Sequence, residues 1–233
     1  MRQVVLDTET TGLEHAQGHR IIEIGCVELV DRKLTGLTYH QYVNPDRLID
    51  DGAMEVHGIT NEFLADKPVF DEIAAEFVEF IAGAELIIHN AAFDVGFMDQ
   101  EFQLAGKDIG PTSNFCTVLD TLGLAREKHP GQKNSLDALC KRYGINNDHR
   151  DLHGALLDSE ILADVYLAMT GGQTTLSLAG ESDGINGGEL IRRVNSELNL
   201  LVVRATDAEI DFHEARLEGI DKATEGQCVW LKE

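Results

Sequence analysis

Apolar positions at the start of the chain follow the pattern of buried strands joined by short turns. The segments at 4–9, 21–30 and 37–45 (VVLDTE, IIEIGCVELV and LTYHQYVNP) are rich in β-branched and other apolar residues. Gly18 and Asp31–Lys33 mark the turns between them. Because such short connections join strands that run in opposite directions, these residues predict an antiparallel meander of three strands.

The pattern then changes to helices that alternate with strands. Phe70, Ile73, Phe77 and Ile81 recur at helical spacing and predict a helix over 70–82. Further strands are predicted at 85–90 and in the first half of 115–125, and further helices at 91–106, in the second half of 115–125, at 135–145 with Ser135 as N-cap, and at 154–169. This order of elements indicates an α/β fold, a mixed sheet flanked by helices.

Glycine interrupts the pattern from Gly171 onwards. Residues 171–188 contain six glycines in 18 positions and little periodicity, so they predict a flexible linker. Beyond it, 188–203 and 205–220 predict two helical or helix–strand pieces. A segment of roughly 45 residues rarely makes a sufficient core alone, so we expect it to dock on a partner. The predicted organisation is a domain at 1–170, a linker at 171–188 and a tail at 189–233.

Composition narrows the class of protein. The formal net charge of −22 argues against a broad basic surface that grips DNA or RNA, so a nucleic-acid substrate would have to be held locally, through metal ions and a few side chains. No run approaches the roughly 18 to 20 apolar residues that span a bilayer, and no signal-peptide pattern precedes the first strand. The four cysteines form no CxxC pair and are typical of reduced, buried thiols. We therefore expect a cytoplasmic protein without a membrane contact.

Two acids stand where a buried strand is predicted. Asp7 and Glu9 follow Val4, Val5 and Leu6 directly and are two positions apart, a spacing that points both carboxylates to the same face of a strand. Like charges held this close repel each other unless they are protonated or bound to a cation. On its own, however, a DxE pattern is also compatible with a solvated turn.

Three further candidates join this pair. Asp94 is predicted in the first turn of a helix that follows a buried strand, and Asp158 stands in a largely apolar helical stretch. His153 is five helical steps from Asp158, about 140° around a helix, so it is expected at the edge of that helix, on a mobile loop. Taken singly, Asp94 is compatible with an acid favoured by the helix dipole, and Asp158 with a surface acid.

Together, these residues suit metal-dependent hydrolysis. Carboxylates from a strand end and two helices are the ligands that hard divalent cations prefer, and four of them balance two Mg²⁺ or Mn²⁺ ions in charge. Two such ions roughly 3.5 to 4 Å apart activate a water and stabilise the leaving oxygen of a phosphodiester. A histidine beside them can take the proton from that water.

The motifs DTETTGL, HNAAFD and HGALLD, in this order, resemble those of the DEDDh exonuclease family, which has a ribonuclease H-like fold. The resemblance covers the whole chain and is strongest to the proofreading exonucleases of bacterial replicative DNA polymerases. It implies that Asp7, Glu9, Asp94 and Asp158 hold the catalytic metals and that His153 is the general base.

The same resemblance implies how the substrate and partners are held. It implies that the 3′-terminal nucleotide of a single-stranded or frayed DNA end is bound by Asp7, Glu9, Thr10, Val56, His57 and Asp158. Gly52 departs from the longer polar side chain of some members, which puts a substrate contact there in doubt. The motif QTTLSL is similar to short QxxLxL peptides that dock on the sliding clamp, through Gln173, Leu176 and Leu178.

The tail at 189–233, with Trp230 as an anchor, would bind the catalytic (alpha) subunit of the polymerase, and a further small, theta-like subunit stays open. The chain is thus expected to be a 3′→5′ DNA exonuclease that removes mispaired 3′-terminal nucleotides, as a subunit of a DNA-directed DNA polymerase. Two alternatives remain: a stand-alone DEDDh ribonuclease that trims RNA 3′ ends, and an assembly module with a silent nuclease fold. A phosphoaspartate phosphatase is disfavoured because its DxD pattern requires an aspartate where Glu9 stands.

Overall fold

The computed structural model describes residues 1–106, 109–147, 152–171, 205–224, Cys228 and Trp230. The chain divides into two compact units, Met1–Ser177 and Leu178–Glu233, which are described separately. The predicted clamp peptide and the first of the two predicted tail pieces lie outside the described residues. No helix in the described ranges has the length and apolar character that crossing a bilayer requires.

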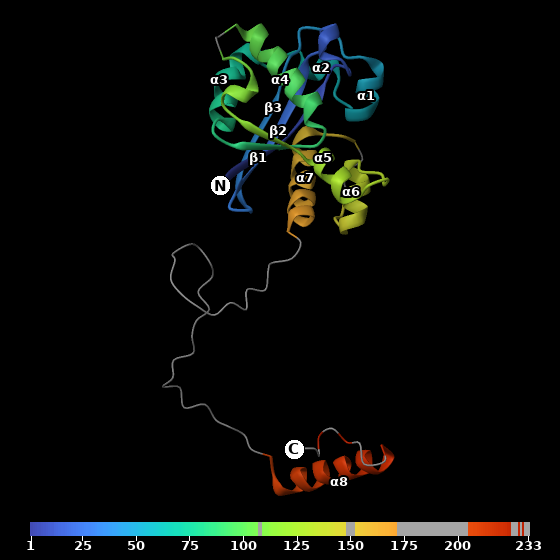
Figure 1. Cartoon of the computed structure of the whole chain (residues 1–233). Coiled ribbons are helices and arrows are strands. Elements are labelled where there is room, and N and C mark those ends of the chain that lie inside the picture. The colour runs from blue at the N-terminus through green and yellow to red at the C-terminus, as the bar shows by residue number, and fades with distance from the viewer. Residues whose placement is uncertain (107–108, 148–151, 172–204, 225–227, 229, 231–233) are drawn as a thin grey trace, which may run out of the picture. The chain divides into compact units, whose positions relative to one another are not determined.

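The first unit is built on one five-stranded mixed sheet (Figure 1). Its strands are β1 (Arg2–Thr10), β2 (Ile21–Val30), β3 (Lys33–Tyr42), β4 (Glu85–Ile88) and β5 (Thr117–Asp120), in the spatial order β3-β2-β1-β4-β5. The pairs β1–β2 and β2–β3 are antiparallel, whereas β1–β4 and β4–β5 are parallel. The predicted meander and the predicted mixed sheet are therefore both confirmed.

The described residues of this unit form seven α-helices around the sheet. They are α1 (Asp51–His57), α2 (Asn61–Leu64), α3 (Phe70–Ile81), α4 (Ala91–Ala105), α5 (Thr121–Lys128), α6 (Leu136–Tyr143) and α7 (Ala155–Thr170), with short 3-10 turns at His15–Gln17 and Thr112–Asn114. The helices α1 and α2 were not predicted, because neither is long enough to show a repeated apolar period. They are held instead by tertiary packing: Ile49, Ile59 and Leu64 form a small core with Ile22 of β2.

Alternate residues of β1 serve the two faces of the sheet. Val4 and Leu6 pack in the core beneath α3 and α4, whereas Val5 packs beneath α7 with Leu162 and Tyr166. The two-residue period of a strand produces this division. Figure 1 shows α3 and α4 on one side of the strands and α7 on the other.

The turn between β2 and β3 is tighter than predicted. Asp31 and Arg32 have φ values of 50° and 65°, as in the type I′ turns that join hairpin strands, and β3 begins at Lys33 rather than near residue 37. A non-glycine residue in this region is strained. The guanidinium of Arg32 donates to Leu167 O (3.0 Å) and Thr170 Oγ1 (2.8 Å), and these hydrogen bonds hold the hairpin against the end of α7.

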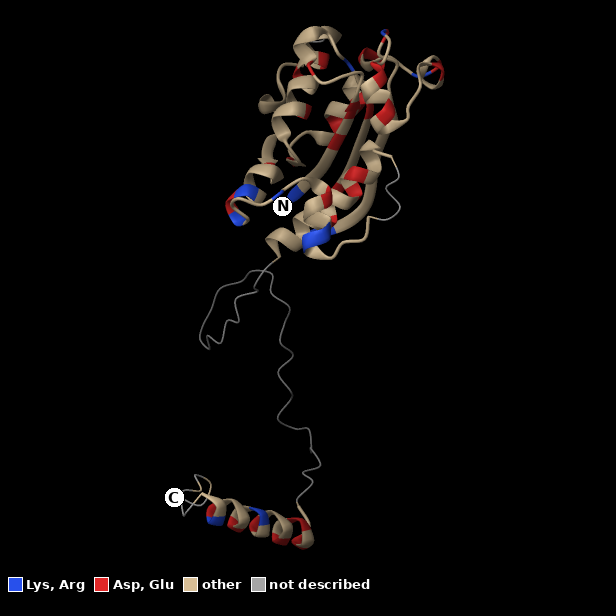
Figure 2. Cartoon of the chain, turned by 90° about the vertical axis from the view of Figure 1, so that its right-hand side faces the viewer, with Lys and Arg blue, Asp and Glu red and all other residues tan. Residues whose placement is uncertain are grey.

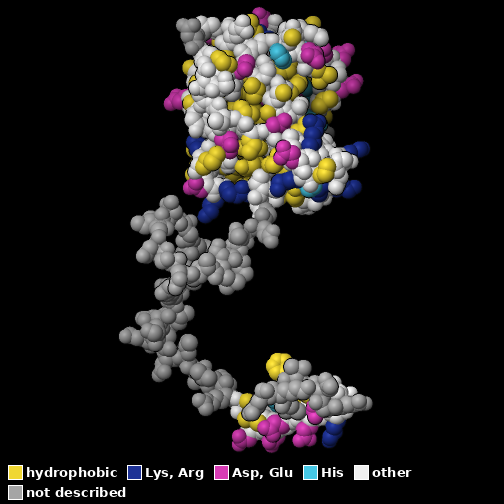
Figure 3. Space-filling model, viewed as in Figure 1, with side chains coloured by type: hydrophobic (Ala, Val, Ile, Leu, Met, Phe, Trp, Pro, Cys, Tyr) yellow, Lys and Arg dark blue, Asp and Glu magenta, His cyan; other side chains and the backbone are white. Residues whose placement is uncertain are grey.

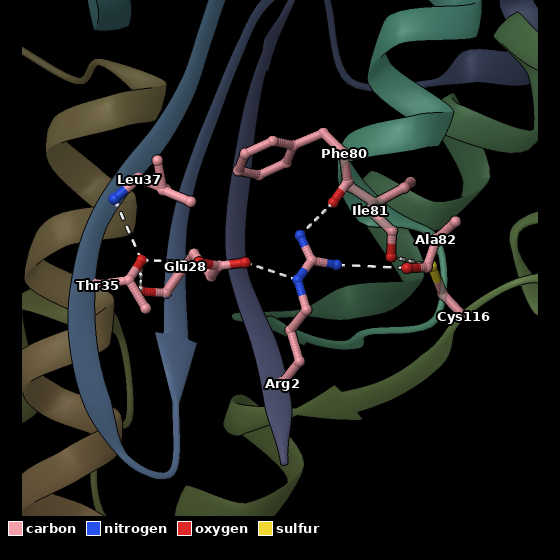
Figure 4. Close-up of polar contacts among 8 residues, drawn as sticks. All are labelled: Arg2, Glu28, Thr35, Leu37, Phe80, Ile81, Ala82 and Cys116. Carbon is pink, nitrogen blue, oxygen red and sulfur yellow. Dashed lines mark hydrogen bonds and ion pairs between the residues drawn. The ribbon is translucent and has the colours of Figure 1, made fainter.

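Arg2 joins three elements at the start of β1 (Figure 4). Its guanidinium donates to Glu28 Oε1 of β2 at 2.6 Å and to the carbonyls of Phe80 (2.6 Å) and Ala82 (3.3 Å) at the end of α3. Glu28 also accepts from Thr35 Oγ1 at 2.8 Å. A cation at a helix C-terminus stabilises the last carbonyl groups, so this contact anchors α3 against the sheet.

In the second unit, α8 (Asp207–Ala223) confirms a helix for the second predicted tail piece. It begins with a capping box in which Thr206 and Glu209 exchange hydrogen bonds. Ile210, Phe212 and Ile220 are exposed on it. All four cysteines, including Cys228 near its end, are buried free thiols, as predicted.

We expect Phe77→Ala to lower the free energy of unfolding by about 3 to 5 kcal/mol, because truncating a buried ring removes apolar burial and leaves a cavity. Phe77 is fully buried and its ring lies 5.5 to 6.3 Å from those of Tyr39, Phe70 and Phe102. Urea denaturation of the full chain measures the change. The control Leu104→Ala, at a site 58% exposed, should stay within about 0.5 kcal/mol of the parent. Equal midpoints for the two variants would contradict this core.

Candidate active site

A hollow of about 850 Å³ contains all five residues predicted to be catalytic. Its walls come from the end of β1, the start of α4, the α5–α6 region and the start of α7. The lining residues are Asp7, Thr8, Glu9, His89, Asn90, Phe93, Asp94, Leu122, Arg126, Gly131, Gln132, Asn134, Ser135, Leu136, Asp137, His153 and Asp158. Segments that are 150 residues apart in sequence thus meet at one edge of the sheet.

Asp7 and Glu9 share a face of β1, as their spacing predicts. Asp7 and Glu9 are two and four positions after Val5, whose side chain packs beneath α7, so all three side chains point to the same face of β1. Both acids are partly exposed in the hollow. The register between β1 and β2 shifts between Glu9 and Thr10. Such irregularities bend a strand and redirect its side chains, and here the shift comes directly after the second acid.

Asp94 approaches from the first turn of α4 and is 3% exposed. Its Oδ1 accepts from the backbone N of Thr8 at 3.1 Å and from Thr8 Oγ1 at 2.7 Å, so the carboxylate is fastened to β1 between the two strand acids. Burial raises the pKa of Asp94 to about 7, against the lowering effect of the hydrogen bonds from Thr8. A carboxyl in this state favours protonation or a bound cation near neutral pH.

Asp158 and His153 come from either side of the start of α7. Asp158 lies in its first turn and is 3% exposed, whereas His153 precedes the helix, as predicted, and is about half exposed. His153 Nδ1 lies 3.4 Å from Asp158 Oδ2. The backbone N of His153 donates to the carbonyl of Val56 at 3.1 Å, which fixes the histidine beside the end of α1.

Glu9, His153 and Asp158 each offer a ligand atom, and these atoms all lie within 4.8 Å of one another. Oxygen donors from two carboxylates suit a hard divalent cation, and Asp7 and Asp94 bring two more carboxylates to the same hollow. The donor set therefore fits divalent metal ions. The geometry brings His153 close enough to be a ligand or a base, and the role of base rests on the family resemblance.

Of the residues predicted to hold the terminal nucleotide, Asp7, Glu9 and Asp158 line the hollow, whereas Thr10, Val56 and His57 do not. Thr10 is buried and donates through Oγ1 to Gly12 O at 2.6 Å. His57 is buried and accepts from Ile59 N at 3.0 Å, and burial lowers its pKa. Val56 is exposed, and the hydrogen bond that its carbonyl accepts from the backbone N of His153 places it next to the candidate catalytic residues. Gly52 faces open space.

Sequence reasoning missed the far wall of the hollow, where Arg126, Gln132 and Asn134 lie. Arg126 lies on α5, and the loop that carries Gln132 and Asn134 is held by Arg142, which donates to Asn134 Oδ1 and Gln132 Oε1, both at 3.0 Å. The signal that could have found it is a local excess of basic residues at 126–142 in a chain of net charge −22.

In metal-free protein, Asp94 should make stability depend on pH. The pKa of this carboxyl is raised by folding, so its contribution is present at low pH and is lost as pH rises through about 7. We expect the free energy of unfolding of the parent, relative to that of Asp94→Asn, to fall between about pH 4 and pH 7 and to level off above it, with a total loss on the order of 4 kcal/mol. Thermal melts in EDTA measure the difference, and both proteins keep His57 and His89, whose titration therefore cancels. A constant difference across this range would contradict the assignment, and added divalent metal should restore stability at pH 8.

Comparison with known proteins shows the family to which this chain belongs. A sequence model of the exonuclease family matches residues 4–166. DNA polymerase III subunit epsilon of Escherichia coli (strain K12) is 57% identical over 98% of this chain and 97% of its own, and the subunit of the same name from Haemophilus influenzae is 49% identical over 99% and 95%.

Solved structures agree. Exonuclease X in complex with 5′ overhanging duplex DNA has 29% identity and a TM-score of 0.58 over 72% of this chain and 91% of that one. The nuclease domain of 3′hExo, a DEDDh family member bound to rAMP, has 21% identity and a TM-score of 0.63 over 73% and 92%, a likeness of fold. The chain therefore belongs to the exonuclease family and, within it, to the DNA polymerase III epsilon subunits.

Proposed function

We propose that Asp7, Glu9, Asp94 and Asp158 hold two divalent cations, Mg²⁺ or Mn²⁺, at the 3′ end of a DNA strand. As a member of its family the chain is a metal-dependent 3′→5′ exonuclease. The observation that supports this assignment of residues is the convergence of Glu9, Asp158 and His153 within 4.8 Å, in a hollow that also holds Asp7 and Asp94. When bound, the cations supply the polarisation of a water molecule and the positive charge that stabilises the leaving oxygen.

His153 is the group we assign to take the proton from the attacking water. It is partly exposed and stands before the helix rather than inside it, so its ring has access to the hollow. The Asp158 carboxylate lies 3.4 Å from His153 Nδ1, where it can orient the ring towards the hollow. The bond from His153 N to Val56 O holds the base next to the segment to which we assign the terminal nucleotide, together with Thr10 and His57.

Burial of the acids restricts which DNA ends can react. Asp94 and Asp158 are each 3% exposed, so a phosphodiester must enter the hollow to reach them. A single strand can do so, whereas a paired end is held in the duplex. Because a mispaired end frays more readily than a matched one, the enzyme removes mispaired 3′-terminal nucleotides and serves as the proofreading subunit of the polymerase.

Surface charge supports a tethered rather than a free enzyme. Figure 2 shows Asp and Glu positions along the ribbons of both units, and in Figure 3 the Lys and Arg side chains of the first unit gather towards one end of the face in view. With a formal charge of −22, attraction of DNA over the whole surface is weak. Attachment beside a polymerase supplies a high effective concentration of 3′ ends instead.

We assign that attachment to the residues after the exonuclease domain at 1–170. The tail at 189–233 binds the polymerase alpha subunit, and the exposed Ile210, Phe212 and Trp230 are suited to a partner surface. The linker at 171–188 binds the sliding clamp through Gln173, Leu176 and Leu178. A small theta-like subunit on the exonuclease domain would complete the assembly, which works in the cytoplasm.

Digestion of 5′-labelled DNA and RNA of matched sequence tests the activity. With Mg²⁺ we expect shortening of single-stranded DNA from its 3′ end, none with EDTA, and a loss of roughly 100-fold or more in His153→Ala, because the general base is gone. Denaturing gels resolve the products. A strong preference for RNA would favour the trimming ribonuclease, and no cleavage of either polymer would favour the silent assembly module.

Replacement of Gln173, Leu176 and Leu178 by Ala tests the clamp peptide. We expect weaker clamp binding, because the apolar side chains that fill the clamp pocket are lost, with hydrolysis of single-stranded DNA unchanged. Surface plasmon resonance on immobilised clamp gives the affinity, and Thr174→Ala in the same segment is the control. Clamp affinity equal to that of the parent would reduce this segment to a plain linker.

A further inference from the structure

The start of α7 is held by a side chain from another element. Gly154 is its N-cap and has no side chain that could accept from the first turn. The backbone N of Ala155 donates instead to Glu23 Oε2 of β2, at 3.1 Å. A carboxylate at this end of a helix is also favoured by the helix dipole. Glu23 therefore caps α7 across 132 residues of sequence.

Glu23 is a further buried acid of the first unit, since it is only 2% exposed. A buried carboxylate is destabilising unless its oxygens accept hydrogen bonds. Here Oε2 accepts from Ala155, and Oε1 lies 2.7 Å from His40 Nε2 of β3. Both oxygens are thus directed to protein groups, so Glu23 is placed to orient the site rather than to ligate an ion.

The sheet register puts this cap beside the two strand acids. Glu9 pairs with Glu23, and Asp7 pairs with Gly25, so each acid of β1 has a neighbour on β2 that contacts α7. A Cβ on Gly25 would lie 2.2 Å from the backbone of Ala155, which means that only glycine lets α7 sit this close. Ser159 Oγ adds a hydrogen bond to Gly25 O at 2.8 Å.

We propose that Glu23 is a positioning residue for the metal site: its carboxylate holds the start of α7 so that Asp158 and His153 stay within reach of Glu9. This inference rests on the proposed function. Asp158 is one turn into the helix from the capped Ala155, so loss of the cap would let the first turn move relative to β1. The ligand atoms of Glu9, His153 and Asp158 would then no longer lie close enough together to bind one ion.

Two variants separate the effect of side-chain length at residue 23 from the effect of its charge. Glu23→Gln keeps the reach and an acceptor oxygen for Ala155 but removes the charge, whereas Glu23→Asp keeps the charge and withdraws the oxygens by one methylene. We expect Mn²⁺ affinity, measured by the electron paramagnetic resonance signal of free Mn²⁺, to fall about 10-fold or more in Glu23→Asp and Glu23→Ala and less than 3-fold in Glu23→Gln. The turnover number on single-stranded DNA should follow the same order, with KM for DNA nearly constant.

Glu28→Ala is the matched control, since Glu28 is also a buried, hydrogen-bonded glutamate of β2 but contacts Arg2 and Thr35 instead of α7. It should lower the melting temperature and leave Mn²⁺ affinity unchanged. The inference is overturned if Glu23→Asp binds Mn²⁺ as well as or better than Glu23→Gln, or if Glu23→Ala loses only stability, as Glu28→Ala does. Absence of Mn²⁺ binding and of DNA digestion in the parent chain would instead refute the proposed function.

Discussion

The antiparallel pairing of β1 with β2 is the constraint on which the rest of the site depends. It sets Asp7 beside Gly25 and Glu9 beside Glu23, and the two residues of β2 in turn fix the start of α7. A slip of one residue would turn every side chain of β1 to the opposite face. The distance between the strand acids and those of α7 is thus set by a ladder of backbone hydrogen bonds and not by the acids, which repel one another.

The acids are tolerated because each is restrained by a different part of the fold. Thr8 donates twice to Asp94, while His153 lies against Asp158. For the strand acids Asp7 and Glu9 we propose that bound divalent cations supply neutralising charge. Repulsion between the carboxylates destabilises a metal-free site of this kind, and a bound cation relieves it.

The sequence predicted the strands, the long helices and the five acidic and histidine candidates, because each left a periodic or motif signal. It did not predict α1 and α2, because their few apolar residues form no repeated pattern and are stabilised by packing around Ile22, which is distant in sequence. It also missed Glu23: the acid stands inside the apolar run IIEIG, but its partners, His40 and Ala155, are distant in sequence. Likewise, β3 begins earlier than predicted because Asp31 and Arg32 adopt positive φ values and form a two-residue turn. Neither residue is the glycine that usually signals such a turn.

The position of α7 in the chain has a consequence for how the protein is made. This helix is the last element of the first unit, and it covers Val5, Val27 and Leu29 on one face of the sheet. During synthesis that apolar face lacks its covering helix until residues 155–170 have been made. A folding intermediate that exposes such an apolar face is prone to aggregation. His153 and Asp158 belong to this same late segment, so the proposed metal site stays incomplete until the start of α7 has been made.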